Sequence, residues 1–328
     1  MRFDYGLDEL KEELMKKKPK KVLVQLPEGM KGNAPELGSF FHNLSIQAIF
    51  SGDTCWGACA PATIEAKQLG ADLIVHFGHA PFMKAGFPII YVEVKDNTPL
   101  LPLVKKSCAS LRSHKTLGLS FAVQHRHLIP DIIKAYQYNG FTIMQSKKKG
   151  HAAYEGHVVG CEYAGLKAIQ NEVDAFVVIG NRFHGIGAAI AVAKPVFLID
   201  VYNQHITYLS AERDLIIKQR AVAIDRLKHA KTVGIIIGTK QGQSFGTPNR
   251  IMTLCKKNNK EAVLITMDEF SPDKLTNFSG INCFIELACP RIAIDDIKRY
   301  GKTVLTYNEA LVALGEKSWT SFLNEGIL

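Results

Sequence analysis

Lys21-Val22-Leu23-Val24-Gln25-Leu26 opens a pattern that recurs at Lys115-Thr116-Leu117-Gly118-Leu119-Ser120 and at Lys231-Thr232-Val233-Gly234-Ile235-Ile236. Each is a short, mostly apolar run that begins with lysine and follows an amphipathic stretch, as expected of a buried strand preceded by a helix. A polar turn, a second helical stretch and a second apolar run follow each one. These second runs are residues 47–50, 141–144 and 262–265.

Two further apolar runs close each copy of the pattern. The third runs, residues 71–78, 173–180 and 281–288, end in a small residue, and the fourth runs are residues 89–94, 196–200 and 303–307. Short strands that alternate with helices are typical of βαβ units and a parallel sheet. We therefore predict an α/β protein of three similar domains (an internal triplication), each a mostly parallel four-stranded sheet with flanking helices. The expected domains are residues 1–97, 98–206 and 207–328.

Composition narrows the class of protein. The 328 residues are 47% hydrophobic, which excludes a disordered chain, and the net charge of +9 indicates a basic surface. The N-terminus has no apolar signal core, and the longest apolar runs stop well short of the roughly 18 residues of a membrane span. We expect a soluble cytoplasmic protein with no membrane association.

Seven cysteines are too few for a disulfide scaffold, and their odd number favours reduced thiols that are buried, catalytic or bound to metal. In open α/β sheets the functional crevice lies beyond the carboxyl ends of the strands. Cys59 and Cys161 occupy matching places after the second strands of the first and second repeats, and Cys289 follows the third strand of the third. One thiol from each domain suits a shared cluster, and three thiolates leave one iron of a 4Fe-4S cluster open to a substrate.

The other cysteines have simpler interpretations. Free cysteine behaves as a small hydrophobic residue, so Cys108, Cys255 and Cys283 are assigned to packing. Cys55 precedes Cys59 by four residues, but Ala62 stands where a compact three-cysteine loop would need its third thiol. Spacing favours Cys59 over Cys55 as a ligand, and it leaves the role of Cys55 open.

Four segments together resemble the diphthamide biosynthesis radical enzymes, the 2-(3-amino-3-carboxypropyl)histidine synthases, in their archaeal form. They are Gly52-Asp53-Thr54-Cys55-Trp56-Gly57-Ala58-Cys59, residues 69–79, Gly160-Cys161 and Ala288-Cys289-Pro290-Arg291. The resemblance implies that Cys59, Cys161 and Cys289 bind one 4Fe-4S cluster. It further implies that the cluster cleaves S-adenosylmethionine (SAM) and that a 3-amino-3-carboxypropyl group passes to a histidine of translation elongation factor 2. A homodimer and an unidentified electron donor are implied as well.

Residues beyond the ligands are candidates for binding SAM. Gln241 and Gly242 follow the first strand of the third repeat, at the edge where ligands bind, although they also suit an ordinary turn. Arg291 has the chemistry to grip the SAM carboxylate or to pair with Asp295. His76 and His79 are expected to line the site at most, because three thiolates already account for the cluster. No catalytic side chains beyond the cluster ligands are predicted, since the cofactors carry the reaction.

Two rival functions follow from the same residues. A basic α/β protein that binds RNA fits the charge, but the sequence has no aromatic RNA-binding motif or GXXG loop, so direct nucleic-acid binding is not expected. The second rival function is that of a zinc-dependent, non-redox enzyme, which would use the same three thiolates and a water. Iron content distinguishes this enzyme from the cluster protein.

Overall fold

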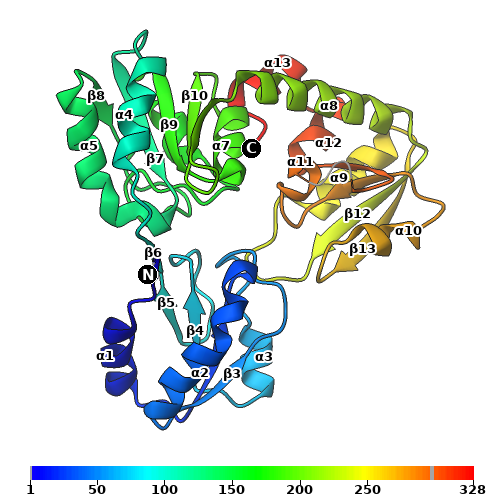
Figure 1. The fold of residues 1–328 in the computed structure, drawn as a ribbon. Coiled ribbons are helices and arrows are strands. Elements are labelled where there is room, and N and C mark those ends of the chain that lie inside the picture. Colours follow the sequence, from blue (N-terminus) through cyan, green and yellow to red (C-terminus); the bar gives the residue numbers. More distant parts are fainter. Residues whose placement is uncertain (1, 296–298) are drawn as a thin grey trace.

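The computed structural model describes residues 2–295 and 299–328, and it places three larger sheets around a common centre (Figure 1). The first sheet contains β2 (Lys21–Gln25), β3 (Gln47–Phe50), β4 (Leu73–Phe77) and β5 (Ile89–Val92). The second contains β7 (Thr116–Phe121), β8 (Thr142–Met144), β9 (Ala175–Gly180), β10 (Val196–Asp200) and β11 (His205–Tyr208). The third contains β12 (Thr232–Gly238), β13 (Glu261–Met267), β14 (Cys283–Glu286) and β15 (Thr303–Leu305).

The three sheets share one strand order. It runs β3-β2-β4-β5 in the first, β8-β7-β9-β10 in the second and β13-β12-β14-β15 in the third, and all of these neighbours are parallel. In each sheet the first and third strands of the copy occupy the two central positions, which explains their continuous apolar runs. The predicted α/β class with mostly parallel sheets is confirmed.

A repeated carboxylate fastens the central strands of the first two sheets. The side chain of Asp72, just before β4, accepts hydrogen bonds from the backbone N–H groups of Lys20 and Lys21 at 2.7 and 2.9 Å. Asp174, just before β9, accepts two equivalent bonds of 2.8 Å from Lys115 and Thr116. The equivalent third position is Asn282. Equivalent aspartates therefore make the same pair of hydrogen bonds at the start of the neighbouring central strand in two of the sheets.

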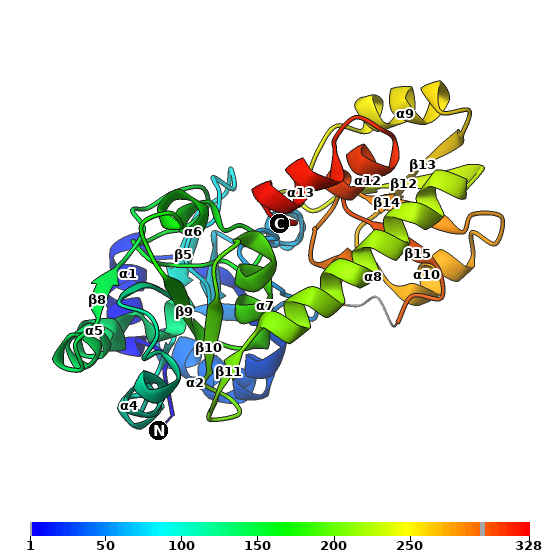
Figure 2. The same cartoon turned by 90° about the horizontal axis from the view of Figure 1, so that it is seen from above.

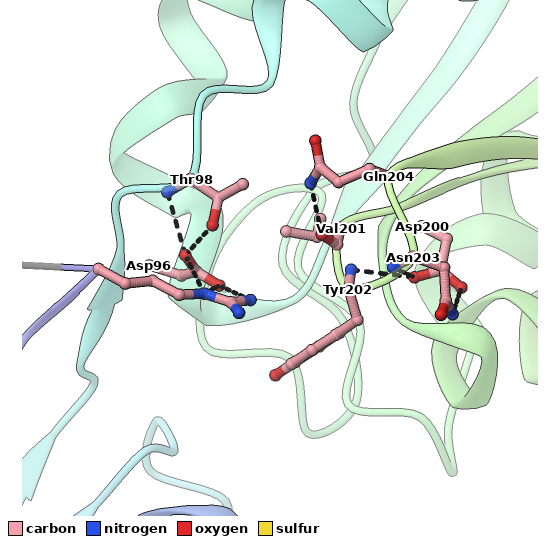
Figure 3. Close-up of polar contacts among 8 residues, drawn as sticks. Asp96, Thr98, Asp200, Val201, Tyr202, Asn203 and Gln204 are labelled. Carbon is pink, nitrogen blue, oxygen red and sulfur yellow. Dashed lines mark hydrogen bonds and ion pairs between the residues drawn. The ribbon is translucent and has the colours of Figure 1, made fainter.

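The second sheet differs from the prediction because it has a fifth, antiparallel strand. The Asp200 carboxylate accepts hydrogen bonds of 3.0 Å from the backbone N–H groups of Tyr202 and Asn203, and this turn reverses the chain into β11 (Figure 3). Such a side-chain-to-backbone turn is typical of aspartate. β11 spans residue 206, at which a domain boundary was expected.

The N-terminal segment is tied to the junction between the first two sheets. β1 (Phe3–Asp4) pairs with β6 (Lys95–Asp96), and the buried Asp96 carboxylate accepts hydrogen bonds from Thr98 (Figure 3). The Arg2 guanidinium pairs with Asp96 at 3.0 Å and lies 5.1 Å from the centroid of the Tyr202 ring.

The helices cover the sheets and connect them. Those around the first two sheets are α1 (Leu7–Lys17), α2 (Ala34–Asn43), α3 (Thr63–Gln68), α4 (Leu101–Ser110), α5 (Ile129–Tyr138), α6 (Ala164–Ile169) and α7 (Arg182–Ala191), with short 3-10 helices at Glu28–Asn33 and Val123–Leu128. The later ones are α8 (Ser210–His229), α9 (Pro248–Lys257), α10 (Pro272–Thr276), α11 (Ile292–Asp295), α12 (Tyr307–Ala313) and α13 (Trp319–Glu325). The 20-residue α8 runs from the second sheet to the third (Figure 2).

The interior of the third unit contains a satisfied buried ion pair. Arg220 of α8 is 1% exposed and pairs with Glu309 at 2.6 Å, and it also donates to the carbonyls of Ala293 and Val304 at 2.7 Å each. Burying a guanidinium and a carboxylate costs free energy because both lose their water. The hydrogen bonds of this pair offset that cost.

The C-terminus packs back onto the second unit. The Ile327 N–H donates to the Ile190 carbonyl at 2.9 Å, and Lys167 donates to the carbonyl of Leu328. No helix within the described part of the chain is long and apolar enough to span a membrane.

Candidate functional site

Cys59, Cys161 and Cys289 lie in loops beyond the carboxyl ends of strands in three different sheets. Cys59 lies between β3 and α3, Cys161 precedes α6, and Cys289 lies between β14 and α11. Burial raises the pKa of all three thiols, that of Cys161 to about 12. After burial, the charge of Cys59 raises the pKa of Cys161, and the charges of Glu286, Cys161 and Cys59, in that order, raise the pKa of Cys289. The fold thus brings the three thiols within electrostatic range of one another.

The loop after β12 lies against Cys59. The Gly242 N–H donates to the Cys59 carbonyl at 2.8 Å, and a Cβ on Gly242 would stand 2.5 Å from that oxygen, so no larger residue fits there without a shift. The amide nitrogen of Gln243 donates to the Cys59 sulfur at 3.6 Å. Gln241 is exposed. Gln241 and Gly242 were the candidates from the sequence, but it is Gln243 that contacts the Cys59 sulfur. In the sequence, the only signal for Gln243 is that it is another amide donor in the same loop.

Arg291 connects the third sheet to the loop of Cys161. It pairs with Asp295 at 2.7 Å, donates to the Phe183 carbonyl at 2.9 Å, and its guanidinium carbon lies 4.0 Å from the centroid of the Phe183 ring. The same ring fills the space beside Gly160, whose φ of +82° only glycine adopts easily. The expected alternative, an ion pair with Asp295, is therefore present, although Arg291 is buried and not on the surface.

One nitrogen of Arg291, Nη1, is buried and has no hydrogen-bond partner among the described residues. A buried guanidinium nitrogen without a partner is rare, because leaving it unpaired costs free energy. Contact of Arg291, Gln241 or Gly242 with SAM stays a prediction, and Nη1 is the atom available for it on Arg291.

The turn that carries Cys289 is built on a buried carboxyl group. One Glu286 oxygen accepts hydrogen bonds from the N–H groups of Ala288 and Cys289 at 3.0 and 2.8 Å. Burial raises the pKa of Glu286 to about 8, even though these two bonds act in the opposite direction. Glu286 thereby holds the backbone at Cys289 in one conformation.

Cys55 lies with two histidines of the first sheet. Its sulfur and ring nitrogens of His76 and His79 all lie within 4.8 Å of one another. Burial lowers the pKa of His76 to about 3 and that of His79 to about 4, so both rings are neutral at neutral pH. Cys55 is 2% exposed, and burial raises the pKa of its thiol to about 12. The structure therefore gives Cys55 neighbours different from those of Cys161 and Cys289.

The three remaining cysteines are packing residues. Cys255 and Cys283 belong to the apolar core beneath the third sheet. Cys108 packs against the core of the second sheet, and its sulfur lies 3.4 Å from the Val104 carbonyl oxygen.

The chemistry of the donor set suits an iron–sulfur cluster. Cysteine thiolates are the usual ligands of such clusters, and three of them leave one iron open. The raised pKa values mean that the thiols are protonated without metal, so that cluster binding releases protons. Three partly buried thiols, each in a loop of a different unit, would hold the cluster.

Three α/β units, each with one cysteine beyond the carboxyl end of a strand and with these thiols in electrostatic range of one another, have the arrangement expected of a cysteine-ligated metalloprotein. Residues 26–323 match the family described as "Putative diphthamide synthesis protein". The chain belongs to this family.

Several named relatives match this chain over most of their own length. A 2-(3-amino-3-carboxypropyl)histidine synthase of Pyrococcus horikoshii is 31% identical over 94% of this chain and 89% of its own. Subunit 1 of the Schizosaccharomyces pombe synthase is 30% identical over 92% of this chain and 72% of its own. The crystal structure of Dph2 from P. horikoshii with a 4Fe-4S cluster superposes with a TM-score of 0.87, at 28% identity, over 96% of this chain and 92% of that one.

Proposed function

We propose that the chain transfers a 3-amino-3-carboxypropyl group from SAM to a histidine of translation elongation factor 2, as the first step of diphthamide synthesis. The observation that carries this proposal is that Cys59, Cys161 and Cys289 each lie beyond the carboxyl end of a strand in a different sheet, within electrostatic range of one another. The names of the relatives and the cluster in the P. horikoshii Dph2 structure support it.

The three thiolates would hold a 4Fe-4S cluster, which supplies the electron that cleaves the bond between the SAM sulfur and its γ carbon. The chain itself supplies position and shielding from water. Gln243 donates a hydrogen bond to the Cys59 sulfur, and such bonds to ligand sulfurs tune a cluster. Arg291 is held by Asp295 and Phe183, which leaves Nη1 for the SAM carboxylate.

The proposal includes partners. Elongation factor 2 is the protein substrate, an electron donor of unidentified kind reduces the cluster, and the enzyme works as a homodimer in the cytoplasm. The net charge of +9 suits a protein substrate with an acidic face.

Product analysis tests the proposed function. The anaerobically purified and reduced protein is incubated with SAM, and the nucleoside products are separated. Methylthioadenosine is the expected product, and 5′-deoxyadenosine would overturn the mechanism. About four irons per chain are expected from the cluster formula, whereas one zinc per chain would favour the non-redox enzyme.

A further inference from the structure

Three histidines lie beyond the carboxyl ends of strands in the first two sheets. His79 follows β4, His157 lies in the segment that pairs with the end of β7, and His184 stands in the first turn of α7. The Gly78 carbonyl, beside His79, accepts a hydrogen bond of 2.5 Å from Gln124, just after β7, and His157 bridges to Phe121 at the end of the same strand. After burial and larger contributions that include Arg126 and Arg291, the charge of His79 also lowers the pKa of His157 and of His184. They come from the first two sheets and are neutral at neutral pH.

A chain of hydrogen bonds settles which nitrogen of His79 carries the proton. The amide nitrogen of Gln25 donates to the Ala60 carbonyl at 2.9 Å, and its oxygen accepts from the Ala62 N–H at 3.2 Å, so the amide orientation is defined. The same oxygen lies 3.0 Å from Nδ1 of His76 and can only accept, so Nδ1 carries the proton of that neutral ring. Nε2 of His76 must then accept from Nδ1 of His79, which lies at 3.0 Å. The remaining nitrogen of His79, Nε2, keeps a free lone pair.

The contact between the two rings is a hydrogen bond in its geometry. Their centroids are 5.2 Å apart while the facing nitrogens are 3.0 Å apart, so the two nitrogens lie close to the line between the centroids. Two imidazoles that bind one tetrahedral ion converge on it at an angle instead. Although Cys55 completes a set of possible metal ligands, this geometry favours the hydrogen-bonded chain.

His157 has the opposite tautomer. Its Nδ1 accepts a hydrogen bond from the Ala153 N–H at 3.1 Å, so the proton of the neutral ring is on Nε2. His184 matches His79 instead: the Asn181 oxygen accepts from the His184 backbone N–H at 3.2 Å and from Nδ1 at 2.8 Å, which leaves Nε2 unprotonated. Among the described residues, the side-chain contacts of these rings use Nδ1 of His79 and Nδ1 of His157; a further bond of the His79 ring to the Phe77 backbone belongs to the protonated Nδ1, because Nε2 of His76 already requires a proton there.

We propose that His79 and His157 bind the imidazole of the protein substrate, with Nε2 of His79 accepting from its N–H and the Nε2–H of His157 donating to its lone pair. A neutral imidazole offers one donor and one acceptor, and these two rings present the complementary pair. Gln25 and His76 act as positioning residues that fix the tautomer of His79. The assignment rests on the proposed function, because that function makes the substrate group a histidine.

A double-mutant cycle tests the pairing. Binding of unmodified elongation factor 2 to the cluster-loaded enzyme is compared with binding of the same factor with its target histidine replaced by leucine. One lost hydrogen bond is worth about a 5-fold change in affinity, so the wild-type enzyme is expected to discriminate by roughly 10- to 30-fold. His79→Leu and His157→Leu should each reduce that ratio by about 5-fold. His79→Gln, which keeps an acceptor, and His157→Gln, which keeps a donor, should retain most of it.

His229→Leu is the matched control, because His229 is exposed on the far part of α8. His229→Leu should keep the wild-type discrimination ratio and rate of methylthioadenosine formation. His79→Leu and His157→Leu should keep the wild-type iron content and circular-dichroism spectrum, which a general structural defect would change. An unchanged discrimination ratio in His79→Leu would overturn the proposal, as would one zinc per chain that disappears in Cys55→Ser.

Failure of the proposed function would look different. In that case the wild-type enzyme forms no methylthioadenosine and does not distinguish the two forms of elongation factor 2, and both proposals are overturned. If the wild type does both and the variants discriminate equally well, only the roles of His79 and His157 are overturned. Nitrogen NMR of the imidazoles reports the two tautomers independently of either activity, and a proton on Nε2 of His79 would also overturn the assignment.

Discussion

Gly160→Ala is expected to damage both the fold around Cys161 and the capacity to hold a cluster. Gly160 has a φ of +82°, and a Cβ there would collide with the ring of Phe183. A left-handed conformation costs an alanine roughly 1–2 kcal/mol, and overpacking adds about 1–3 kcal/mol. The sum predicts a loss of about 2–5 kcal/mol in the free energy of unfolding.

The chain offers a control that separates these two effects. Gly140 has a φ of +87°, but a Cβ there would meet nothing within 4 Å. Gly140→Ala should therefore cost only the roughly 1–2 kcal/mol of the backbone conformation. Both variants are compared with wild type by urea unfolding followed by circular dichroism.

Iron content provides the second measurement. A shift of the Phe183 ring away from the new methyl group would disturb its contact with the Arg291 guanidinium, which lies 4.0 Å from its ring centroid. Gly160→Ala should therefore bind less iron after reconstitution, whereas Gly140→Ala should bind the wild-type amount. Equal stability losses in the two variants, or full iron content in Gly160→Ala, would refute this reasoning.

Further predictions concern ligands, sulfur chemistry, the buried ion pair and pH. Replacing Cys59, Cys161 or Cys289 by Ala should each abolish most iron binding, while Cys108→Ala and Cys255→Ala retain it; equal loss in Cys55→Ala would contradict the ligand assignment. Gln243→Leu removes a hydrogen bond that lowers the pKa of the Cys59 thiol, so alkylation of Cys59 in cluster-free protein should slow, as read by peptide mass spectrometry, and Gln241→Leu should leave it unchanged. Arg220→Ala should cost about 3–5 kcal/mol of unfolding free energy by leaving Glu309 buried and unpaired, and urea unfolding of Arg220→Met combined with Glu309→Leu should show most of it recovered. Burial lowers the pKa of His125 to about 4, so between pH 6.5 and 4 the unfolded chain binds a proton that the folded chain refuses, and stability falls on acidification. His125→Leu should reduce that slope by about one proton in cluster-free protein, and an unchanged slope would contradict the assignment.

Much of the fold was readable from the sequence because its signals are local. The first run of each copy corresponds to a strand of the structure, namely β2, β7 and β12. A short, continuous apolar run between polar turns is typical of a strand buried on both faces. The fifth strand of the second sheet was missed. It depends on the turn at Asp200, in which one carboxylate accepts two backbone N–H groups, and its alternation of residues is too short to predict a strand.

The residues of the candidate site were likewise predicted only in part from the sequence. Position at the strand ends, together with the family resemblance, led to Cys59, Cys161 and Cys289, because parallel strands deliver their carboxyl ends to one edge whatever the details of packing. Sequence reasoning selected Gln241 and Gly242 from the loop after β12, yet Gln243 is the residue that contacts the Cys59 sulfur. Which side chain of a loop faces inward depends on its backbone path, and local residue types do not determine that path.

The amino-acid sequence by itself thus determined the strands of the three α/β units and the cysteines that follow those strands, because apolar periodicity and the succession of strands and helices along the chain are local properties. Only the tertiary structure decided that Arg291 is locked against Phe183, that Cys55 lies with His76 and His79, and which nitrogen of His79 and of His157 carries a proton. Several of these properties depend on contacts between residues far apart in sequence, such as Gln25 with His76 and Arg291 with Phe183, and such contacts exist only once the chain has folded.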